Sequence, residues 1–316
     1  GVITSLLKDA IKPNIVQTLE NNPAIIHGGP FANIAHGCNS ILATKTALKF
    51  ADYVITEAGF GADLGAEKFL NIKCRKAGLK PKAAVVVATV KALKLHGDIE
   101  EKDLKEENLE ALAKGVQNLE KHIENLRKFN LPIVVALNVF VTDTEKELAF
   151  LENWAKEQGV ELSRTEVWEK GGLGGVDLAE KVVKAVEEND KELQLLYKDE
   201  ASITEKIETV CREIYGADGV NFSDEVKAEI ERIERLGFKH LPVCMAKTPA
   251  SLTDNAKIKG RPTGFNITIN DVKLRSGAGF VVAYANKVLT MPGLPKVPSA
   301  LNIDIDEETE TIVGIF

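Results

Sequence analysis

Residues 51–70 read ADYVITEAGFGADLGAEKFL, and this stretch decides the expected fold. Residues 53–56, YVIT, are apolar and rich in β-formers, which predicts a short buried strand. The next residues, EAGFGAD, break that pattern, and a helical pattern runs from about residue 64 through residue 73. The stretch is therefore predicted to be a strand–loop–helix unit of a parallel α/β sheet. Ligands of such sheets gather at loops beyond the carboxyl ends of the strands.

Two glycines flank an aromatic residue in this loop, in the order Gly59, Phe60, Gly61. Glycine lets the backbone approach a ligand closely and adopt a positive φ at little cost. The loop therefore fits a ligand-binding role. Spacing alone favours a tight strand-to-helix turn that tucks Phe60 into a core, because glycine is common in short connections. Both interpretations stay open.

A second glycine-bearing loop, HGGPFAN, spans residues 27–33. It lies between a predicted short strand at residues 24–26 and a predicted helix at residues 39–50. His27 and His36 flank the loop, and no further metal ligands stand near them in the sequence. A hydrogen-bonding or nucleotide-contacting role is therefore favoured over a metal site. The alternative is an ordinary histidine that is hydrogen-bonded within the fold.

The rest of the chain alternates between predicted strands and helices. Continuous apolar runs at residues 83–90 and 133–137 predict strands that are covered on both faces, as in a parallel sheet. A further strand is predicted at residues 160–167, and amphipathic helices at residues 109–129 and 144–158. Other expected elements are helices at residues 2–10, 176–189, 203–215 and 223–236, and strands at residues 240–245, 265–274 and 279–286.

This order of elements predicts an α/β protein. The main part is a mostly parallel sheet with helices on both faces, followed by a second α/β domain and a small α+β domain. The expected divisions are residues 1–117, 118–250 and 251–316.

Composition excludes several classes of partner. The chain has 316 residues, a net charge of -7 with both signs well mixed, and no basic run, so nucleic acid and anionic membranes are not expected partners. No apolar run is long enough to span a bilayer. Cys38, Cys74, Cys211 and Cys244 lie far apart, which disfavours a zinc site. They are predicted to be reduced, mostly buried thiols of a cytoplasmic protein.

Two aromatic residues stand at the ends of predicted strands. Phe140 follows the strand at residues 133–137, and Trp168 follows the strand at residues 160–167. The GGLGG run at residues 171–175 has neither the GxxxxGK[ST] nor the GxGxxG spacing, so it indicates a phosphate site only weakly. A tryptophan beside such a loop is better suited to the flat face of an aromatic ligand.

Several motifs together closely resemble formate–tetrahydrofolate ligase. They are HGGPFANIAHGCNS at residues 27–40, EAGFGADLGAEKF at residues 57–69, the Phe140 and Trp168 loops, and TMPGLPK at residues 290–296. The resemblance covers essentially all 316 residues. It implies synthesis of 10-formyltetrahydrofolate from formate, ATP and tetrahydrofolate, through formyl phosphate. It also implies Mg²⁺ bound with ATP, activation by K⁺ or NH₄⁺, and a homotetramer.

The resemblance also implies roles for individual residues. Phe60 and Gly61 match the loop that lines the formyl phosphate site, and Phe140 and Trp168 match the aromatic pair that stacks the pterin ring. The implied nucleotide-side loop comprises His27, Gly28, Gly29, Ala32 and Asn33. No metal ligand is implied among these residues.

One departure from the family pattern changes the expectation for activity. The family carries a P-loop of the form GxxxxGKT, and no Gly-Lys-Ser or Gly-Lys-Thr exists in this sequence. We therefore expect a C-terminal part of the ligase. Residues 1–117 would then be the remainder of a large P-loop NTPase-like, nucleotide-binding domain, with residues 118–250 on the folate side. Such a chain is expected to be inactive alone. The alternative is a folate-binding or structural fragment, or a split subunit, without catalytic activity of its own.

Overall fold

A three-stranded parallel sheet forms one half of the fold. The computed structural model describes residues 1–286, 288, 291 and 295–314. The strands β3 (Ala84–Ala88), β4 (Ile133–Asn138) and β5 (Glu161–Thr165) pair in that order, and both pairings are parallel. The central strand β4 is buried along almost its whole length, as a continuous apolar run between two neighbours requires. This sheet confirms the predicted α/β class.

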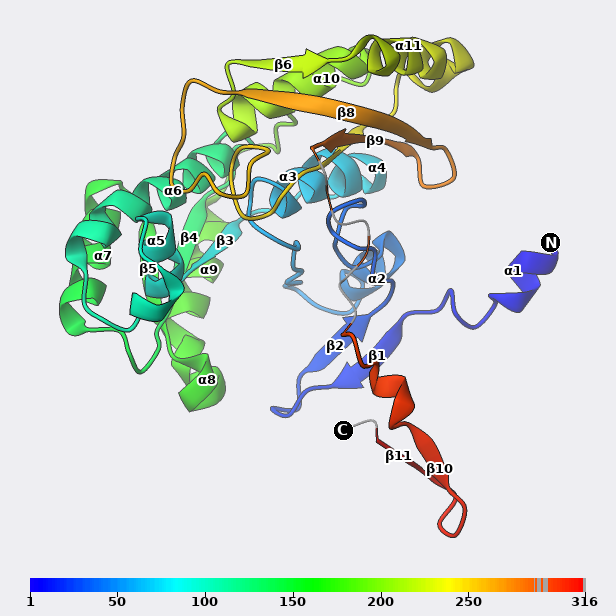
Figure 1. Ribbon diagram of the computed structural model, residues 1–316. Coiled ribbons are helices and arrows are strands. Elements are labelled where there is room, and N and C mark those ends of the chain that lie inside the picture. Colours follow the sequence, from blue (N-terminus) through cyan, green and yellow to red (C-terminus); the bar gives the residue numbers. More distant parts are fainter. Residues whose placement is uncertain (287, 289–290, 292–294, 315–316) are drawn as a thin grey trace.

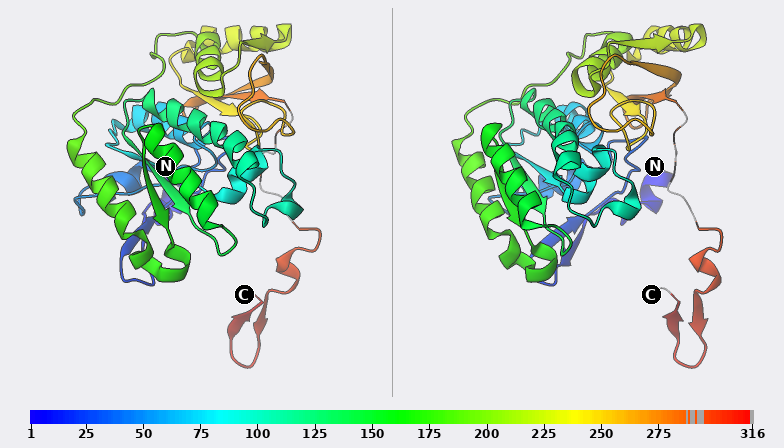
Figure 2. Two further views of the ribbon diagram at one scale, coloured as in Figure 1. Left: turned by 90° about the vertical axis from the view of Figure 1, so that its left-hand side faces the viewer. Right: turned by 60° about the vertical axis from the view of Figure 1, so that its left-hand side comes forward.

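Helices flank this sheet and connect its strands. The helices α5 (Val90–His96) and α6 (Leu109–Arg127) lie between β3 and β4, and α7 (Glu145–Glu157) lies between β4 and β5. The helices α6 and α7 pack against each other, and α9 (Val176–Glu188) packs against β4 and β5 (Figure 2). Hydroxyl caps begin two of the helices: Thr89 caps α5, and Thr144 forms a capping box at α7. Helix α5 therefore begins soon after β3 and helix α7 soon after β4, so the loops at the carboxyl ends of these two strands are short.

A second, mixed sheet covers the other side of a shared core. Its order is β6 (Gly219–Phe222), β8 (Asn266–Arg275), β9 (Phe280–Ala285) and β7 (Val243–Ala246). An antiparallel hairpin of β8 and β9 forms its centre, and β6 and β7 join in parallel at the two edges. Figure 1 shows β8 and β9 curving over the helices of the N-terminal third. One contiguous cluster of buried apolar side chains includes residues of both sheets.

The remaining elements are helices and two hairpins. The helices α10 (Ile203–Val210) and α11 (Asp224–Ile233) pack against the mixed sheet. The others are α1 (Val2–Leu6), β1 (Asn14–Gln17), β2 (Pro23–Ile26), α2 (Ile41–Ala47), α3 (Gly65–Lys68), α4 (Arg75–Ala77), α8 (Val167–Lys170), β10 (Asp304–Asp306) and β11 (Thr311–Val313). Helix α3 continues through a π-helical turn, Phe69–Cys74, into α4, which confirms the predicted helix after residue 64.

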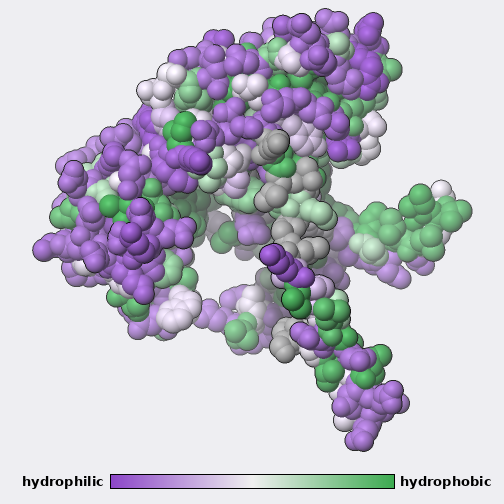
Figure 3. All heavy atoms as spheres, viewed as in Figure 1, coloured by the Kyte–Doolittle hydropathy of each residue, from purple (hydrophilic) through white to green (hydrophobic). Residues whose placement is uncertain are grey.

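Both ends of the described chain project from the body. Helix α1 and the β10–β11 hairpin lie apart from the sheets in Figure 1, and apolar side chains are exposed on both (Figure 3). Examples are Leu6, Ile305 and Ile312. The TMPGLPK motif at residues 290–296 lies largely outside the described residues.

The predicted strand at residues 53–56 is wrong. This segment has no regular structure, and 91% of the Ile55 side chain is exposed. A strand needs a neighbour to pair its backbone groups, and within the described chain no strand pairs with this segment. The strand expected at residues 24–26 exists as β2, but it pairs antiparallel with β1 instead of joining a parallel sheet.

The division into three domains stays a prediction. Its first boundary, residue 117, falls within α6, between two strands that pair in one sheet.

In the part of the chain that the structure describes, no helix has the length and apolar character needed to cross a membrane.

Candidate functional site

The two glycine loops predicted from the sequence, residues 27–40 and 57–65, lie against each other. The Gly59 N–H donates to the Gly37 carbonyl over 3.0 Å. A Cβ atom on Gly59 would lie 2.9 Å from Cβ of Ala32 in the other loop, whereas one on Gly65 would overlap the carbonyl of Gly59 and one on Gly37 would overlap Ala32, each within its own loop. Close contact between the loops therefore requires Gly59, the folding of each loop on itself requires Gly65 and Gly37, and Gly37 also has a positive φ of 57°.

A buried lysine connects the two glycine loops. It lies in the helix that follows the second loop, and it donates hydrogen bonds to the backbone of the first loop. Lys68 on α3 is fully buried, and its Nζ donates to the carbonyls of Ala32 (2.6 Å) and Asn33 (3.1 Å). A buried ammonium group needs such partners. The side chain after one loop therefore fixes the backbone of the other.

The two histidines that flank the first loop differ: His27 has hydrogen-bond partners at both ring nitrogens, whereas Nδ1 of His36 is buried without a partner in the described residues. His27 Nδ1 lies 2.7 Å from Ser40 Oγ, which also accepts the Ala43 N–H, and His27 Nε2 lies 3.0 Å from the Ala10 carbonyl. In a neutral ring, Ser40 thus donates to Nδ1 while Nε2 donates to Ala10. Burial lowers the pKa of His36, and neighbouring lysines lower it further. His27 therefore fits the hydrogen-bonded alternative, with both ring nitrogens engaged.

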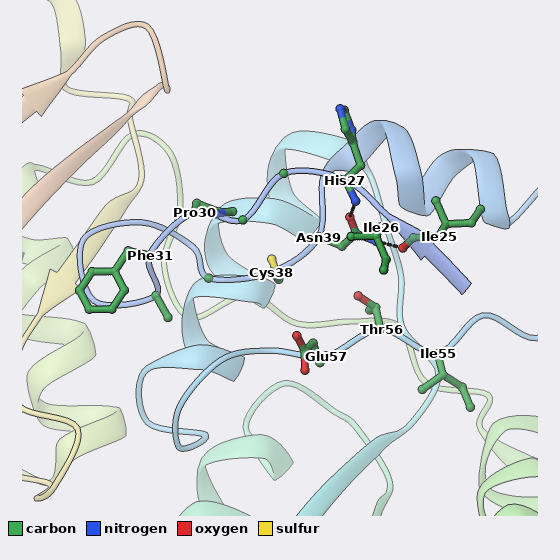
Figure 4. Close-up of a pocket in the computed structure, with 14 residues that line it drawn as sticks. Ile25, Ile26, His27, Pro30, Phe31, Cys38, Asn39, Ile55, Thr56 and Glu57 are labelled. Atoms are coloured by element: carbon green, nitrogen blue, oxygen red, sulfur yellow. Dashed lines mark hydrogen bonds between the residues drawn. The ribbon is translucent and has the colours of Figure 1, made fainter. Parts of the chain in front are cut away.

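A pocket of about 460 Å³ opens between the first loop and residues 55–57 (Figure 4). Of the predicted nucleotide-side residues, His27, Gly28, Gly29 and Ala32 line it, whereas Asn33 does not. On the other side, Thr56 and Glu57 contribute polar groups. Thr56 Oγ1 is buried and has no hydrogen-bond partner within the described residues. A concave surface of this size with a few polar groups suits a small ligand.

Phe60 has a strained backbone and a half-exposed ring. Its φ is +66°, a left-handed value that is rare for a bulky residue and often marks a functional loop. The ring meets Phe31 edge-on, with centroids 6.3 Å apart, and 44% of the side chain is exposed. The ring is therefore not tucked into a core. Gly61 is confined as well, because a Cβ atom there would lie 2.7 Å from Asp63 Oδ1.

A buried ion pair ties this loop to the mixed sheet. Asp63 Oδ2 lies 2.9 Å from Nζ of Lys247, the residue after β7, and both side chains are almost wholly buried. Lys247 also donates to the carbonyls of Thr248 (3.0 Å) and Ser251. Burial opposes ionisation of Asp63, but the charges of Lys247 and His122 outweigh it and hold the pKa of Asp63 below its usual range.

A second buried acid lies one turn further along. Glu67 on α3 is fully buried, and burial raises its pKa to about 7, although Asn71 donates to its Oε1 over 2.8 Å. Its other oxygen has no hydrogen-bond partner in the described part of the chain. Sequence reasoning missed Asp63, Glu67 and Lys247. The only local signal was the presence of acidic residues inside the EAGFGADLGAEKF motif.

The two predicted stacking residues stand at one edge of the parallel sheet. Phe140 follows β4 and Trp168 lies in α8, just after β5. Because β4 and β5 are adjacent and parallel, their carboxyl ends meet at the same edge. The Thr165 hydroxyl donates to Asn138 Oδ1 (2.8 Å) and joins the two ends. Phe140 is 41% exposed and Trp168 is 90% exposed, and we call this pair the aromatic wall.

The GGLGG run behind Trp168 folds as a short 3₁₀ helix, Gly171–Gly175. The Gly172 N–H donates to Glu20 Oε1 at the tip of the β1–β2 hairpin over 2.6 Å. A Cβ atom on Gly174 would collide with the backbone of Glu166. Contacts within the chain therefore account for these glycines without a bound phosphate.

Metal-binding side chains do not gather anywhere in the described residues. No group of three or more His, Cys, Asp or Glu side chains in that part of the chain could hold a metal ion. The four cysteines are free and buried, as predicted.

The chain is an α/β protein with exposed aromatic side chains beyond the carboxyl ends of adjacent parallel strands, the edge at which ligands of such sheets gather. A comparison with known protein families matches residues 1–316 to the family described as formate–tetrahydrofolate ligase. The chain therefore belongs to the formate–tetrahydrofolate ligase family, whose members are ligases of one-carbon metabolism.

Proposed function

We propose that this protein takes part in the ATP-dependent formation of 10-formyltetrahydrofolate from formate, ATP and tetrahydrofolate, with formyl phosphate as the intermediate. Family membership supports the reaction class. The observation that carries the proposal is the aromatic wall, with Phe140 and Trp168 exposed at the same edge of the parallel sheet.

The aromatic wall is proposed to bind the pterin ring of tetrahydrofolate. Stacking of a flat heteroaromatic ring contributes about 0.5–1.5 kcal/mol per aromatic pair beyond burial. Trp168 has almost its whole indole available, because only a tenth of its surface is covered within the chain. Residues 118–250 would then form the folate side of the protein.

The glycine loops are proposed to form the side that handles ATP and formyl phosphate. Phe60 and Gly61 would line the formyl phosphate site, and the strained backbone of Phe60 supports this role. His27, Gly28, Gly29 and Ala32 would face the nucleotide, because they line the pocket of about 460 Å³. Asn33 would act through its backbone carbonyl, which Lys68 holds. ATP would bind as its Mg²⁺ complex, and K⁺ or NH₄⁺ would activate the enzyme.

We further propose that residues 1–316 do not complete the phosphate site. Phosphoryl transfer depends on positioning and on charge stabilisation around the phosphates. A P-loop supplies both through its backbone N–H groups and its lysine, and the motif does not occur in this sequence. This chain would then be either the C-terminal portion of a ligase or one subunit of a split ligase. In both cases, residues outside this sequence would supply the P-loop. Assembly as a homotetramer in the cytoplasm is proposed from the family alone.

The test combines a binding assay with an activity assay. Tetrahydrofolate is titrated into the 316-residue chain by calorimetry. Turnover is then measured with formate, ATP, Mg²⁺ and K⁺, with and without an added polypeptide that carries the family's P-loop region. We expect folate binding by the chain alone and product only after the addition. Absence of folate binding would contradict the folate role, and full turnover by the chain alone would contradict the missing phosphate site.

A further inference from the structure

We propose that Lys91 is a positioning residue for the stacking ring of Phe140. The Nζ atom of Lys91 lies 4.6 Å from the centroid of that ring, within the range of a cation–π interaction. Lys91 lies in the first turn of α5, directly after β3, so it stands at the same sheet edge as the aromatic wall. The inference rests on the proposed folate site and adds a residue that no sequence motif indicated.

The backbone of Phe140 is fixed independently of its ring. The Phe140 N–H donates to Asp143 Oδ2 over 2.9 Å, and the Asp143 N–H donates back to the Phe140 carbonyl over 2.9 Å. This closed turn sets the position of the Phe140 Cα atom. The turn does not fix the orientation of the ring plane. That orientation depends on the contacts of the ring itself, and the contact with the Lys91 ammonium is one of them.

A buried ion pair holds the helix that carries Lys91. Lys94, one turn further along α5, donates to Glu147 Oε1 over 2.8 Å, and both side chains are almost completely buried. Glu147 lies in the first turn of α7, immediately after the Phe140 turn, where it also caps the Thr144 N–H. Helix α5 and the Phe140 turn are therefore fixed to each other, and the placement of Lys91 over the ring follows from this anchoring.

The cation also determines which ring face a ligand can use. With Lys91 over one face, a flat ligand stacks on the other, and Phe140 keeps 41% of its surface exposed. The cation is attracted by the negative ring face and draws electron density toward itself. An electron-rich reduced pterin then stacks more favourably against the opposite face. Lys91 also acts on one carboxylate: burial raises the pKa of Asp143, which closes the Phe140 turn, and the charge of Lys91 opposes this rise.

A double-mutant cycle tests this role. Tetrahydrofolate affinity is measured by calorimetry on the whole chain for wild type, Lys91→Met, Phe140→Leu and the double variant. We expect Lys91→Met to weaken binding about 2- to 5-fold, the range of a partly exposed cation–π contact. Lys91→Arg should restore the affinity, since a guanidinium also forms this contact. In the Phe140→Leu background, the Lys91→Met change should have almost no effect, because coupled residues are not additive.

The matched control is Lys184→Met. Lys184 is exposed on α9, in a hollow lined by the amino ends of β4 and β5, so its replacement removes one charge far from the aromatic wall. It should leave the affinity unchanged. If wild type does not bind tetrahydrofolate, the proposed function fails together with this inference. If wild type binds but Lys91→Met has no effect, the role of Lys91 alone is overturned. The role of Lys91 is also overturned if Lys91→Met weakens tetrahydrofolate binding equally in the wild-type and Phe140→Leu backgrounds. The same holds if Lys91→Arg binds as weakly as Lys91→Met.

Discussion

The glycine loops and the aromatic wall hold their residues in opposite ways. In the glycine loops, neighbours within the chain dictate the residue types: Gly65 has no room for a Cβ atom, and Lys68 and Asp63 are buried against fixed partners. The aromatic wall has little such constraint, because Trp168 is 90% exposed. Backbone contacts therefore shape the glycine loops, and exposed side chains shape the aromatic wall. Packing within the chain explains the glycine loops, whereas the exposed faces of the aromatic wall remain available to a ligand.

Replacing Gly65 by alanine gives the largest effect that this contrast predicts. The new methyl group would overlap the backbone carbonyl of Gly59, which has no flexible side chain to move aside. We expect a loss of more than about 4 kcal/mol in the free energy of unfolding, or failure to fold. Urea unfolding measures this change. Gly29→Ala is the control within the same loops, since nothing lies within 4 Å of its added Cβ atom. Equal stability of the two variants would show that the loops are not closely packed.

Breaking the Asp63–Lys247 pair has the next largest effect. Lys247→Met leaves the carboxylate of Asp63 buried without its partner, which costs about 3–5 kcal/mol of stability. The exposed pair of Lys227 and Asp224 provides the control, because Lys227→Met should change stability by about 0–1 kcal/mol. Thermal or urea unfolding of both variants decides the matter. A Lys247→Met protein as stable as the control would mean that the pair does not anchor the Phe60 loop.

Glu67 makes the glycine loops sensitive to pH. Burial raises its pKa from 4.5 to about 7, so the folded protein binds this proton more tightly than the unfolded chain does. The stabilisation is complete below pH 4.5 and is lost as the pH rises through about 7. The loss amounts to about 3 kcal/mol. Glu67→Gln should remove this dependence. Unfolding curves at several pH values test it, and parallel pH profiles for both proteins would contradict it.

The sequence predicted the parallel sheet better than the contacts around the candidate site. The buried apolar run of β4 carries a local signal, and so do the capping threonines of α5 and α7. Residues 53–56 carry the same kind of apolar signal but form no strand, because no strand pairs with them in the described chain. A local sequence pattern does not show whether a partner strand is present. The pairing of Asp63 with Lys247 and the position of Lys91 over Phe140 depend on distant segments. Neither leaves a signature in the local sequence.

On the aromatic wall, Trp168→Ala should affect binding and leave stability unchanged. The exposed indole contributes little to packing, but loss of a stacking face weakens ligand binding by about 1–3 kcal/mol, as for bases on aromatic side chains. Calorimetric titration with tetrahydrofolate measures the binding term, and urea unfolding measures the stability. Loss of stability together with unchanged affinity would reverse the proposed contrast between the two sides of the site.

The central claim is that the aromatic wall binds reduced folate, and tryptophan fluorescence tests it most directly. The chain has two tryptophans: Trp168 on the aromatic wall and Trp154, which is 8% exposed within α7. During titration with tetrahydrofolate, we predict saturable quenching that persists in Trp154→Phe and disappears in Trp168→Phe. Saturable quenching that survives in Trp168→Phe and is lost in Trp154→Phe would contradict the account, as would the absence of any saturable change in the wild-type protein.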